Sequence, residues 1–260
     1  MNNKQSNLGL PIEYQKLPQY FDAHNINERT NATNALVEKL LHEQNVKTVL
    51  DLTCGTGSQV FYLSERGYDV IGSDFSPALI ESARNKAKRK HTNISFLKGD
   101  MRTVKVGKFD AVITIFNAIG HVTEADFERT LKNIRDNLKD DGTYIFDIFN
   151  LQAITDDVIK DFITDIKSTV NGVTFHNHQY SEIEREKGLL ISHDQYTIIK
   201  PNAKLETHSN SFSLKIYTSQ ELQHLLNKNG FKVLNQYDMD GHAFDPDRSL
   251  NSLTVAKKRC

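Results

Sequence analysis

Cysteine is scarce in this chain of 260 residues, which contains only Cys54 and Cys260. Two thiols cannot build a disulfide framework or a four-ligand zinc site. No apolar run approaches the roughly 18 residues that a membrane span requires, and the first residues lack the basic start and apolar stretch of a secretory signal. These absences predict a protein that works in the cytoplasm and has no membrane partner.

An excess of one charge is also absent, because 32 Lys+Arg stand against 33 Asp+Glu, for a net charge of −1. A protein whose main task is to bind nucleic acid usually carries a large positive excess, so we expect no nucleic-acid partner. The basic run at 84–90 suggests RNA at first sight. It falls at the expected carboxyl end of a helix, where the helix dipole favours cations in any case.

Short apolar segments alternate with amphipathic helical segments over the first 150 residues. Helices are expected from residue 31, from residue 60, from Ser76-Pro77 and from Thr123, where cap residues or apolar spacing mark a helix start. The expected strands between them cover 48–52, 68–72, 93–97, 110–116 and 143–149. This alternation predicts an α/β fold with a doubly wound, mostly parallel, Rossmann-like sheet.

The alternation stops after Asn150. Three strand-like segments (173–183, 190–199 and 206–216) follow with turn signals and no helix between them, which predicts an inserted antiparallel β lobe. A helix after Thr218 and two further strands would complete a seven-stranded sheet. The predicted organisation has four parts. Residues 1–28 form an N-terminal lid segment and residues 29–150 the α/β core. Residues 151–216 form the β insertion, which is a candidate homodimer surface, and residues 217–260 complete the core.

The most informative segment is TVLDLTCGTGSQV at 48–60, in which a strand ends in a glycine turn. Gly55 and Gly57 let a ligand approach the backbone closely where strand ends meet. A dinucleotide fold would have a third glycine where this chain has Val60. Asp51 beside the turn disfavours a phosphate and suits a ligand that carries an amino group or a positive charge.

Acidic residues also follow the second and third expected strands. Asp74 can accept both hydroxyls of a ribose, and Phe75 beside it offers an apolar face to a purine. Asp100 can accept a hydrogen bond from an exocyclic amine while Met101 packs on the ring. A ribose, an adenine and a cationic tail without phosphates together indicate S-adenosylmethionine (SAM), with S-adenosylhomocysteine as the product and no metal.

The sequence resembles the class I SAM-dependent methyltransferases from about residue 29 to residue 258. VLDLTCGTG is similar to the first motif of that family, Asp74 to its ribose-binding acid, and KFDAVI to the approach to its fourth strand. Within the family, the segment NAIGH at 117–121, the Arg-Thr at 29–30 and the end FDPDRSLNSLTVAKK look most like glycine N-methyltransferases and glycine/sarcosine methyltransferases. Amino-sugar N,N-dimethyltransferases share the histidine after the fourth strand and the antiparallel lobe.

The resemblance implies a role for each matching position. The methionine end of SAM would lie against Asp51 and the two glycines, with its carboxylate paired to Arg29, and Asp74, Phe75, Asp100, Met101 and Ile115 would hold the rest of the cofactor. The acceptor pocket would contain Asn117 and His121. Tyr14 and Tyr20 fall in the segment that covers the cofactor in these relatives, and Tyr14 is expected to act with Asn117 and His121 in catalysis. His121 would titrate near neutrality if unperturbed and could take the proton of an amine, or it could only precede the next helix.

One position departs from the glycine methyltransferases. They carry an arginine in an Asp-x-Arg-Asn segment that binds the acceptor carboxylate, whereas this chain reads Asp147-Ile148-Phe149-Asn150. We therefore expect N-methylation of a small-molecule amine other than glycine, such as an amino sugar. The alternatives are a small-molecule O-methyltransferase, an RNA methyltransferase, a nicotinamide-dependent oxidoreductase, which the missing third glycine disfavours, and a SAM-binding module without activity.

Overall fold

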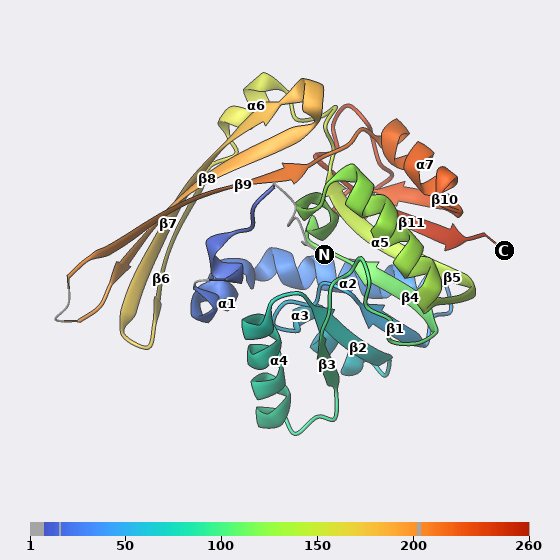
Figure 1. Ribbon diagram of the computed structural model, residues 1–260, viewed down its shortest axis with the longest axis horizontal. Helices are drawn as coiled ribbons and strands as arrows, with labels where there is room; N and C mark the ends of the chain where they lie inside the picture. The colour runs from blue at the N-terminus through green and yellow to red at the C-terminus, as the bar shows by residue number, and fades with distance from the viewer. Residues whose placement is uncertain (1–7, 16, 202–203, 260) are drawn as a thin grey trace, which may run out of the picture.

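The computed structural model describes residues 8–15, 17–201 and 204–259, which form two sheets and the helices packed on them (Figure 1). The larger sheet has seven strands, of which β5, β4, β1, β2 and β3 are parallel neighbours, while β11 is antiparallel to both β5 and β10. The predicted fold class is confirmed. In sheet order the strands are β10 (Phe231–Tyr237), β11 (Asn251–Lys258), β5 (Leu138–Phe149), β4 (Phe109–Thr114), β1 (Thr48–Asp51), β2 (Asp69–Asp74) and β3 (Ser95–Lys98).

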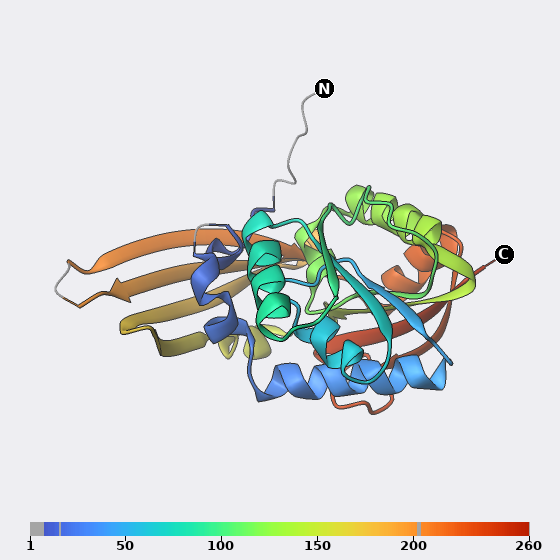
Figure 2. The same cartoon turned by 90° about the horizontal axis from the view of Figure 1, so that it is seen from below.

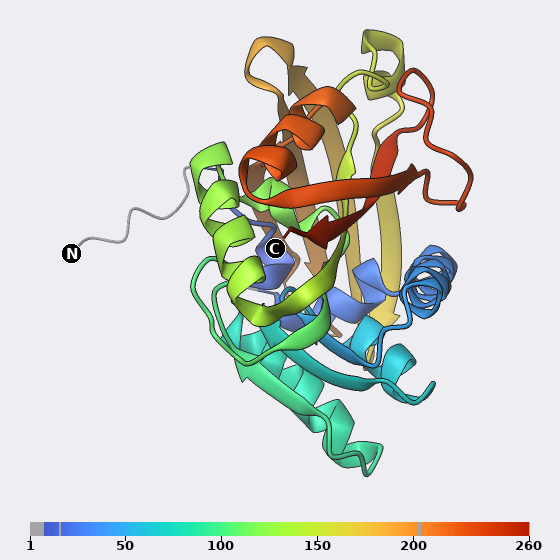
Figure 3. The same cartoon turned by 90° about the vertical axis from the view of Figure 1, so that its right-hand side faces the viewer.

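Helices cover both faces of this sheet (Figure 3). Val37, Phe61 and Ile80 bury the apolar sides of three helices on one face, and Phe127 and Leu222 do so for two helices on the other. No helix of the described residues is long and apolar enough to cross a membrane. The first group is α2 (Glu28–Glu43), α3 (Ser58–Ser64) and α4 (Pro77–Arg89), and the second is α5 (Glu124–Asn137) and α7 (Ser219–Lys228).

Side-chain caps fix where these helices begin. The Ser76 hydroxyl accepts a hydrogen bond from the Leu79 N–H at 3.3 Å, so α4 starts where the Ser-Pro pair predicts. Helix α2 starts three residues earlier than expected. The Asn27 side chain accepts from the Thr30 N–H while the Thr30 hydroxyl accepts from the Asn27 N–H, which is a reciprocal capping box that the apolar spacing alone does not reveal.

The second sheet is an antiparallel lobe that projects from the core past the N-terminal helices (Figures 1 and 2). The three strands expected from the sequence are present, and a fourth, β6, precedes them. Strand β6 lies at the sheet edge, and its alternate residues are only half-buried, so its apolar signal is weak. The lobe consists of β6 (Thr164–Val170), β7 (Val173–Glu184), β8 (Leu189–Ile199) and β9 (Glu206–Lys215), with α6 (Asp156–Lys160) before it and η4 (Arg185–Lys187) within it.

The N-terminal strap (residues 8–15 and 17–25) runs between the lobe and the core (Figure 1). It contains η1 (Ile12–Tyr14), η2 (Pro18–Tyr20) and α1 (Phe21–Asn25). The Leu8 carbonyl accepts a hydrogen bond from the Ser213 N–H of β9 at 2.6 Å, and the Tyr14 carbonyl accepts one from the Ser76 hydroxyl at 2.7 Å. The strap is therefore tied to both units. Residues 1–7 of the predicted lid lie outside the described residues.

Polar side chains are buried where the strap meets the lobe. The Tyr196 hydroxyl donates to Glu13 at 2.7 Å, and His24 lies 3.8 Å from the same carboxylate. Asn177 and Asp194, on the same face of the lobe, are buried, and the side-chain nitrogen and oxygen of Asn177 have no hydrogen-bond partner among the described residues. The Asn210 side chain is the polar neighbour of Asp194. Burial, and then the charge of Glu13, raises the pKa of Asp194 to about 7.

Replacing Asp194 by asparagine is expected to stabilise the protein at pH 8 by about 1–3 kcal/mol, because the neutral amide avoids the cost of burying an ionised carboxylate near Glu13. In the wild type, the pKa of Asp194 is about 7 in the folded protein and 3.8 in the unfolded chain. The unfolded chain therefore loses the proton first as the pH rises, and the stability that Asp194 contributes below pH 3.8 is lost by the time the pH passes 7. The gain should therefore be smaller at pH 5 than at pH 8. Urea unfolding at both pH values measures it, with Asp157→Asn at an exposed position as control. An equal gain at both pH values would contradict this account.

Candidate functional site

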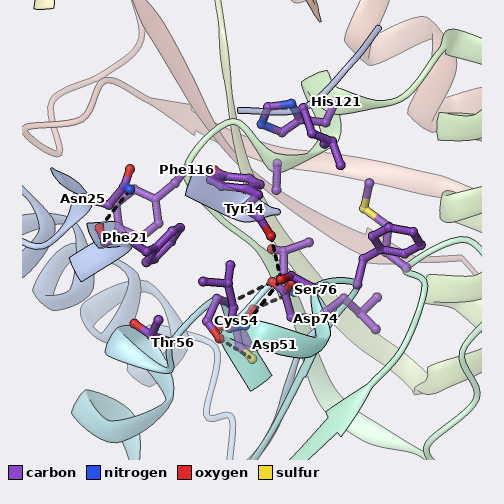
Figure 4. Close-up of a pocket in the computed structure, with 18 of the residues that line it drawn as sticks. Tyr14, Phe21, Asn25, Asp51, Cys54, Thr56, Asp74, Ser76, Phe116 and His121 are labelled. Carbon is purple, nitrogen blue, oxygen red and sulfur yellow. Dashed lines mark hydrogen bonds between the residues drawn. The ribbon is translucent and has the colours of Figure 1, made fainter. Parts of the chain in front are cut away.

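A cavity of about 650 Å³ opens at the carboxyl ends of β1, β2 and β4, beneath the N-terminal strap (Figure 4). This volume falls within the usual range for a small-molecule or cofactor site. Asp51 and Asp74 line one end of the cavity and His121 the other, with Tyr14 between them in Figure 4. The predicted residues that line it are Tyr14, Asp51, Gly55, Asp74, Phe75, Asp100, Met101, Ile115 and His121.

The glycine turn between β1 and α3 brings the backbone to the cavity surface. Gly55 and Gly57 have φ of 53° and 94°, in the left-handed region that other residues seldom adopt. A Cβ on Gly57 would lie 2.9 Å from both Phe61 and Phe96, so the turn also lacks room for a side chain. Asp74 holds the turn in place, because its Oδ2 accepts a hydrogen bond from the Gly55 N–H at 2.8 Å.

The two strand-end carboxylates are deeply buried. Burial raises the pKa of Asp51 to about 7, against a hydrogen bond from the Thr53 N–H, and the neighbouring Asp74 raises it further. Burial likewise raises the pKa of Asp74, opposed by the N–H groups of Ser76 and Gly55. Each carboxylate has lone pairs beyond those that these bonds use. Such a pair favours a ligand that brings positive charge and hydroxyl donors.

Asp100 and Met101 line the cavity beyond Asp74. Burial works to raise the pKa of Asp100, but hydrogen bonds and charge from Arg102 outweigh it and hold that pKa below its usual range. The Arg102 guanidinium also lies 2.8 Å from Asp126. Arg102 is the one lysine or arginine among the described residues that line the cavity, and both of its carboxylate partners are already in place. The cavity wall therefore offers a ligand more negative than positive charge.

Aromatic rings surround the end of the cavity near His121. The Tyr14 ring centre lies 5.5 Å from those of both His121 and Phe21, and the Phe212 ring of the lobe lies 5.9 Å from His121. Burial among these groups lowers the pKa of His121 to about 4. Burial therefore perturbs His121 away from the titration near neutrality expected of an unperturbed imidazole. His121 is neutral at physiological pH and is suited to accept a hydrogen bond rather than to store a proton.

Four predicted residues do not line the cavity: Tyr20, Arg29, Gly57 and Asn117. Arg29 is exposed on the first turn of α2 and lines a separate hollow with Met239. Successive residues of a helix point about 100° apart, and the next residue, Thr30, is the one that faces the cavity. A contact between Arg29 and a ligand in the cavity is thus not supported.

The other three have structural contacts. The Tyr20 ring is buried and stacks on Phe175 of the lobe at 4.9 Å. The Asn117 side-chain oxygen accepts a hydrogen bond from Asn251 at 3.2 Å. Gly57 forms the inner side of the glycine turn, where its N–H donates to the Cys54 carbonyl at 2.8 Å. These residues shape the walls behind the cavity surface.

The structure adds lining residues that the sequence analysis did not identify, among them Phe21, Asn25, Thr56 and Phe116. The Phe21 ring lies against Gly55, 3.1 Å from where a Cβ would stand, and the Thr56 hydroxyl donates to Asp22. Helix α1 thereby covers the glycine turn. The aromatic residues of the strap are the one sequence feature that could have indicated that it lines the cavity. Their contacts, however, depend on how the strap docks on the rest of the chain, which local sequence does not determine.

One further group of residues could hold a metal. Asp238, Asp240 and His242 bring their ligand atoms within 4.8 Å of one another after β10. His242 Nδ1 lies 3.3 Å from Asp238 Oδ2, and backbone N–H groups also donate to that aspartate. These hydrogen bonds account for the cluster as a polar turn.

A doubly wound sheet with a glycine turn and two buried strand-end acids has the features expected of an α/β protein that binds a nucleoside. The family model described as "Methyltransferase domain" matches residues 49–142. The chain is 34% identical over 140 residues to the glycine/sarcosine N-methyltransferase of Aphanothece halophytica. The aligned stretch covers 52% of this chain and 53% of that relative, so the likeness extends over about half of each.

Solved structures share the whole fold. The sugar N-methyltransferase of Streptoalloteichus sp. has a TM-score of 0.76 at 19% identity, covering 100% of this chain and 97% of that one. The SAM-bound amino pentose methyltransferase of Micromonospora echinaspora has a TM-score of 0.71 at 18% identity, covering 97% and 99%. At these identities the likeness is one of fold. Together with the family model, it places a methyltransferase domain at residues 49–142 in a chain that has the fold of SAM-dependent methyltransferases.

Proposed function

We propose that this methyltransferase transfers the SAM methyl group to the amine of a small molecule, with amino sugars as the favoured class. The observation that carries the acceptor class is the lack of an unpaired cation among the described residues that line the cavity. Their one lysine or arginine, Arg102, is already paired with Asp100 and Asp126. An acceptor carboxylate therefore finds no partner of opposite charge among these residues, whereas an amine or a hydroxylated sugar needs none.

The residues of the cavity fit the parts of SAM. Asp51 faces the ammonium of the methionine part, and Gly55 lets that part approach the backbone. Asp74 retains acceptor capacity for the ribose hydroxyls beside the bonds it takes from the turn. The adenine lies among Phe75, Asp100, Met101 and Ile115, which all line the cavity.

When bound, SAM supplies a methyl group on a positively charged sulfur with a good leaving group. The chain's own task is to align the acceptor nitrogen and to exclude water, and such alignment can be worth about 7–11 kcal/mol. Tyr14, Phe116 and His121 form the wall at that end. Because burial keeps the His121 ring neutral, a ring nitrogen can accept a hydrogen bond from the acceptor amine and help to orient it.

The basic run that suggested RNA is partly engaged within the chain. Arg84 donates two hydrogen bonds to the Phe96 carbonyl at 3.0 and 2.7 Å, Lys86 pairs with Asp22, and Lys90 pairs with Glu65. These contacts support a structural role for the run. The homodimer, the absence of a nucleic-acid partner and the cytoplasmic location stay predictions.

A screen of amines and their hydroxyl counterparts, read by release of S-adenosylhomocysteine, tests the proposal. Amino sugars should be turned over, and their matched hydroxyl sugars should not, because only the amine is a strong nucleophile without loss of a proton. Glycine should be a poor acceptor with a high KM. Its carboxylate would need an arginine at the position that Phe149 occupies in this chain. The Phe149 ring instead packs on that of Phe162, with ring centres 5.5 Å apart. Turnover of the hydroxyl sugars alone, or of glycine at low concentration, would contradict the proposal.

A further inference from the structure

The chain bends sharply where β4 ends at the cavity. Phe116 and Asn117 are consecutive non-glycine residues in the left-handed region, with φ of 65° and 56°. Such residues are seldom left-handed, and two in succession are less common still, so the surrounding structure must hold them there. Strain of this kind concentrates at functional sites. The bend directs the Phe116 ring into the cavity, where 41% of it is exposed, and leads into η3 (Ala118–His121).

Asp147, on the neighbouring strand β5, holds this bend. Its Oδ1 accepts a hydrogen bond from the Phe116 N–H at 2.5 Å and its Oδ2 one from the Asn117 N–H at 3.2 Å. Only 1% of Asp147 is exposed, and it does not line the cavity. Asn251 of β11 adds a third bond to the bend, because its side-chain N–H donates to the side-chain oxygen of Asn117 at 3.2 Å.

We propose that Asp147 is a positioning residue, whose carboxylate fixes the Phe116–Asn117 bend and thereby sets the shape of the acceptor end of the cavity. The proposal rests on the proposed function, which places the acceptor there. An ionised carboxylate can accept from both N–H groups at once. An asparagine at this position offers one oxygen and turns an NH₂ group toward the second N–H, so the bend loses one hydrogen bond and gains a repulsive donor pair.

The test compares Asp147→Asn with Asp110→Asn. Asp110 is a matched control, because its carboxylate also accepts from two backbone N–H groups, those of Lys47 and Thr48 at 3.1 and 2.8 Å, but at the opposite end of the sheet. Calorimetry with SAM and steady-state kinetics with the best amine from the screen are the readouts. Asp147→Asn should lower kcat/KM for the amine about 10- to 100-fold while leaving the affinity for SAM unchanged. Asp110→Asn should change neither.

The pH profile provides a second readout. Burial raises the pKa of Asp147 to about 6, against the hydrogen bonds from the bend. Protonation below that pH removes an acceptor, so kcat/KM for the amine should fall more steeply below pH 6 in the wild type than in Asp147→Asn. A purely structural role would give parallel profiles and would overturn the proposal.

Rescue keeps the proposal testable if Asp147→Asn folds poorly. Glycine adopts positive φ without strain, so adding Asn117→Gly to Asp147→Asn should restore part of the lost kcat/KM. An unchanged acceptor kcat/KM in Asp147→Asn, or a loss of SAM affinity equal to the loss of activity, would overturn the positioning role. If the wild type itself failed to bind SAM, the proposed function would fail instead.

Discussion

Asp51→Asn is expected to weaken SAM binding about 10- to 100-fold at pH 8, because it removes a charge-assisted hydrogen bond to the ligand's ammonium group. The side chain is buried at the cavity with a pKa of about 7, so at pH 8 most wild-type molecules carry the ionised form. Isothermal titration calorimetry of both proteins measures the difference. Asp69→Asn is the control, since Asp69 is exposed at the far end of β2 from Asp74.

The same carboxylate makes SAM binding depend on pH. A cation binds the ionised form, so affinity should fall about tenfold per pH unit below 7, as Asp51 takes up a proton in the free protein. In Asp51→Asn, the affinity for SAM should depend less steeply on pH, because Asp74 is then the remaining buried carboxylate with a raised pKa beside the ligand. Wild-type affinity that stays constant from pH 8 to pH 5.5 would show that Asp51 does not face the positive end of the ligand.

Gly57→Ala is expected to lower the free energy of unfolding by about 2–4 kcal/mol, from left-handed strain together with overpacking. Its φ is 94°, and the new methyl group would lie 2.9 Å from Phe61 and Phe96, whose rings pack together at 5.4 Å. SAM binding should weaken with it, because the turn that approaches the ligand has to shift. Urea denaturation and calorimetry measure the two effects.

Gly67→Ala is the matched control for this prediction. Gly67 has φ of 85°, but a Cβ there meets nothing within 4 Å. It therefore carries the backbone strain without the clash, and we expect a loss of about 1–2 kcal/mol with no change in SAM binding. If the two variants lost the same stability, packing around the glycine turn would not be a determinant of the fold.

Local sequence predicted most of the sheet and its helices because their signals are local. Apolar spacing and the Ser76 and Thr218 caps lie within a few residues of the elements that they define. The acids Asp51 and Asp74 could be placed for a similar reason, since parallel strand ends meet at one sheet edge.

What sequence could not provide depends on contacts between distant segments. The bond from Tyr196 to Glu13 joins residues 183 positions apart, so the strap's register was not predictable. The depressed pKa of His121 arises from burial that includes Tyr14 and Phe212, one from each end of the chain. Arg29 was predicted to contact the cofactor but faces another hollow, because it stands one residue, about 100° around the helix, from Thr30, which lines the cavity.

The double attachment of the strap has a consequence for turnover. Leu8 is bonded to β9 and Glu13 to β8, while the Tyr14 carbonyl is bonded to Ser76 beside the ribose acid. A movement of the strap away from the core would break its bonds to Ser76 and Thr56 and keep those to the lobe, which carries Phe212 beside His121. We therefore expect release of the nucleoside and release of the methylated product to be coupled steps.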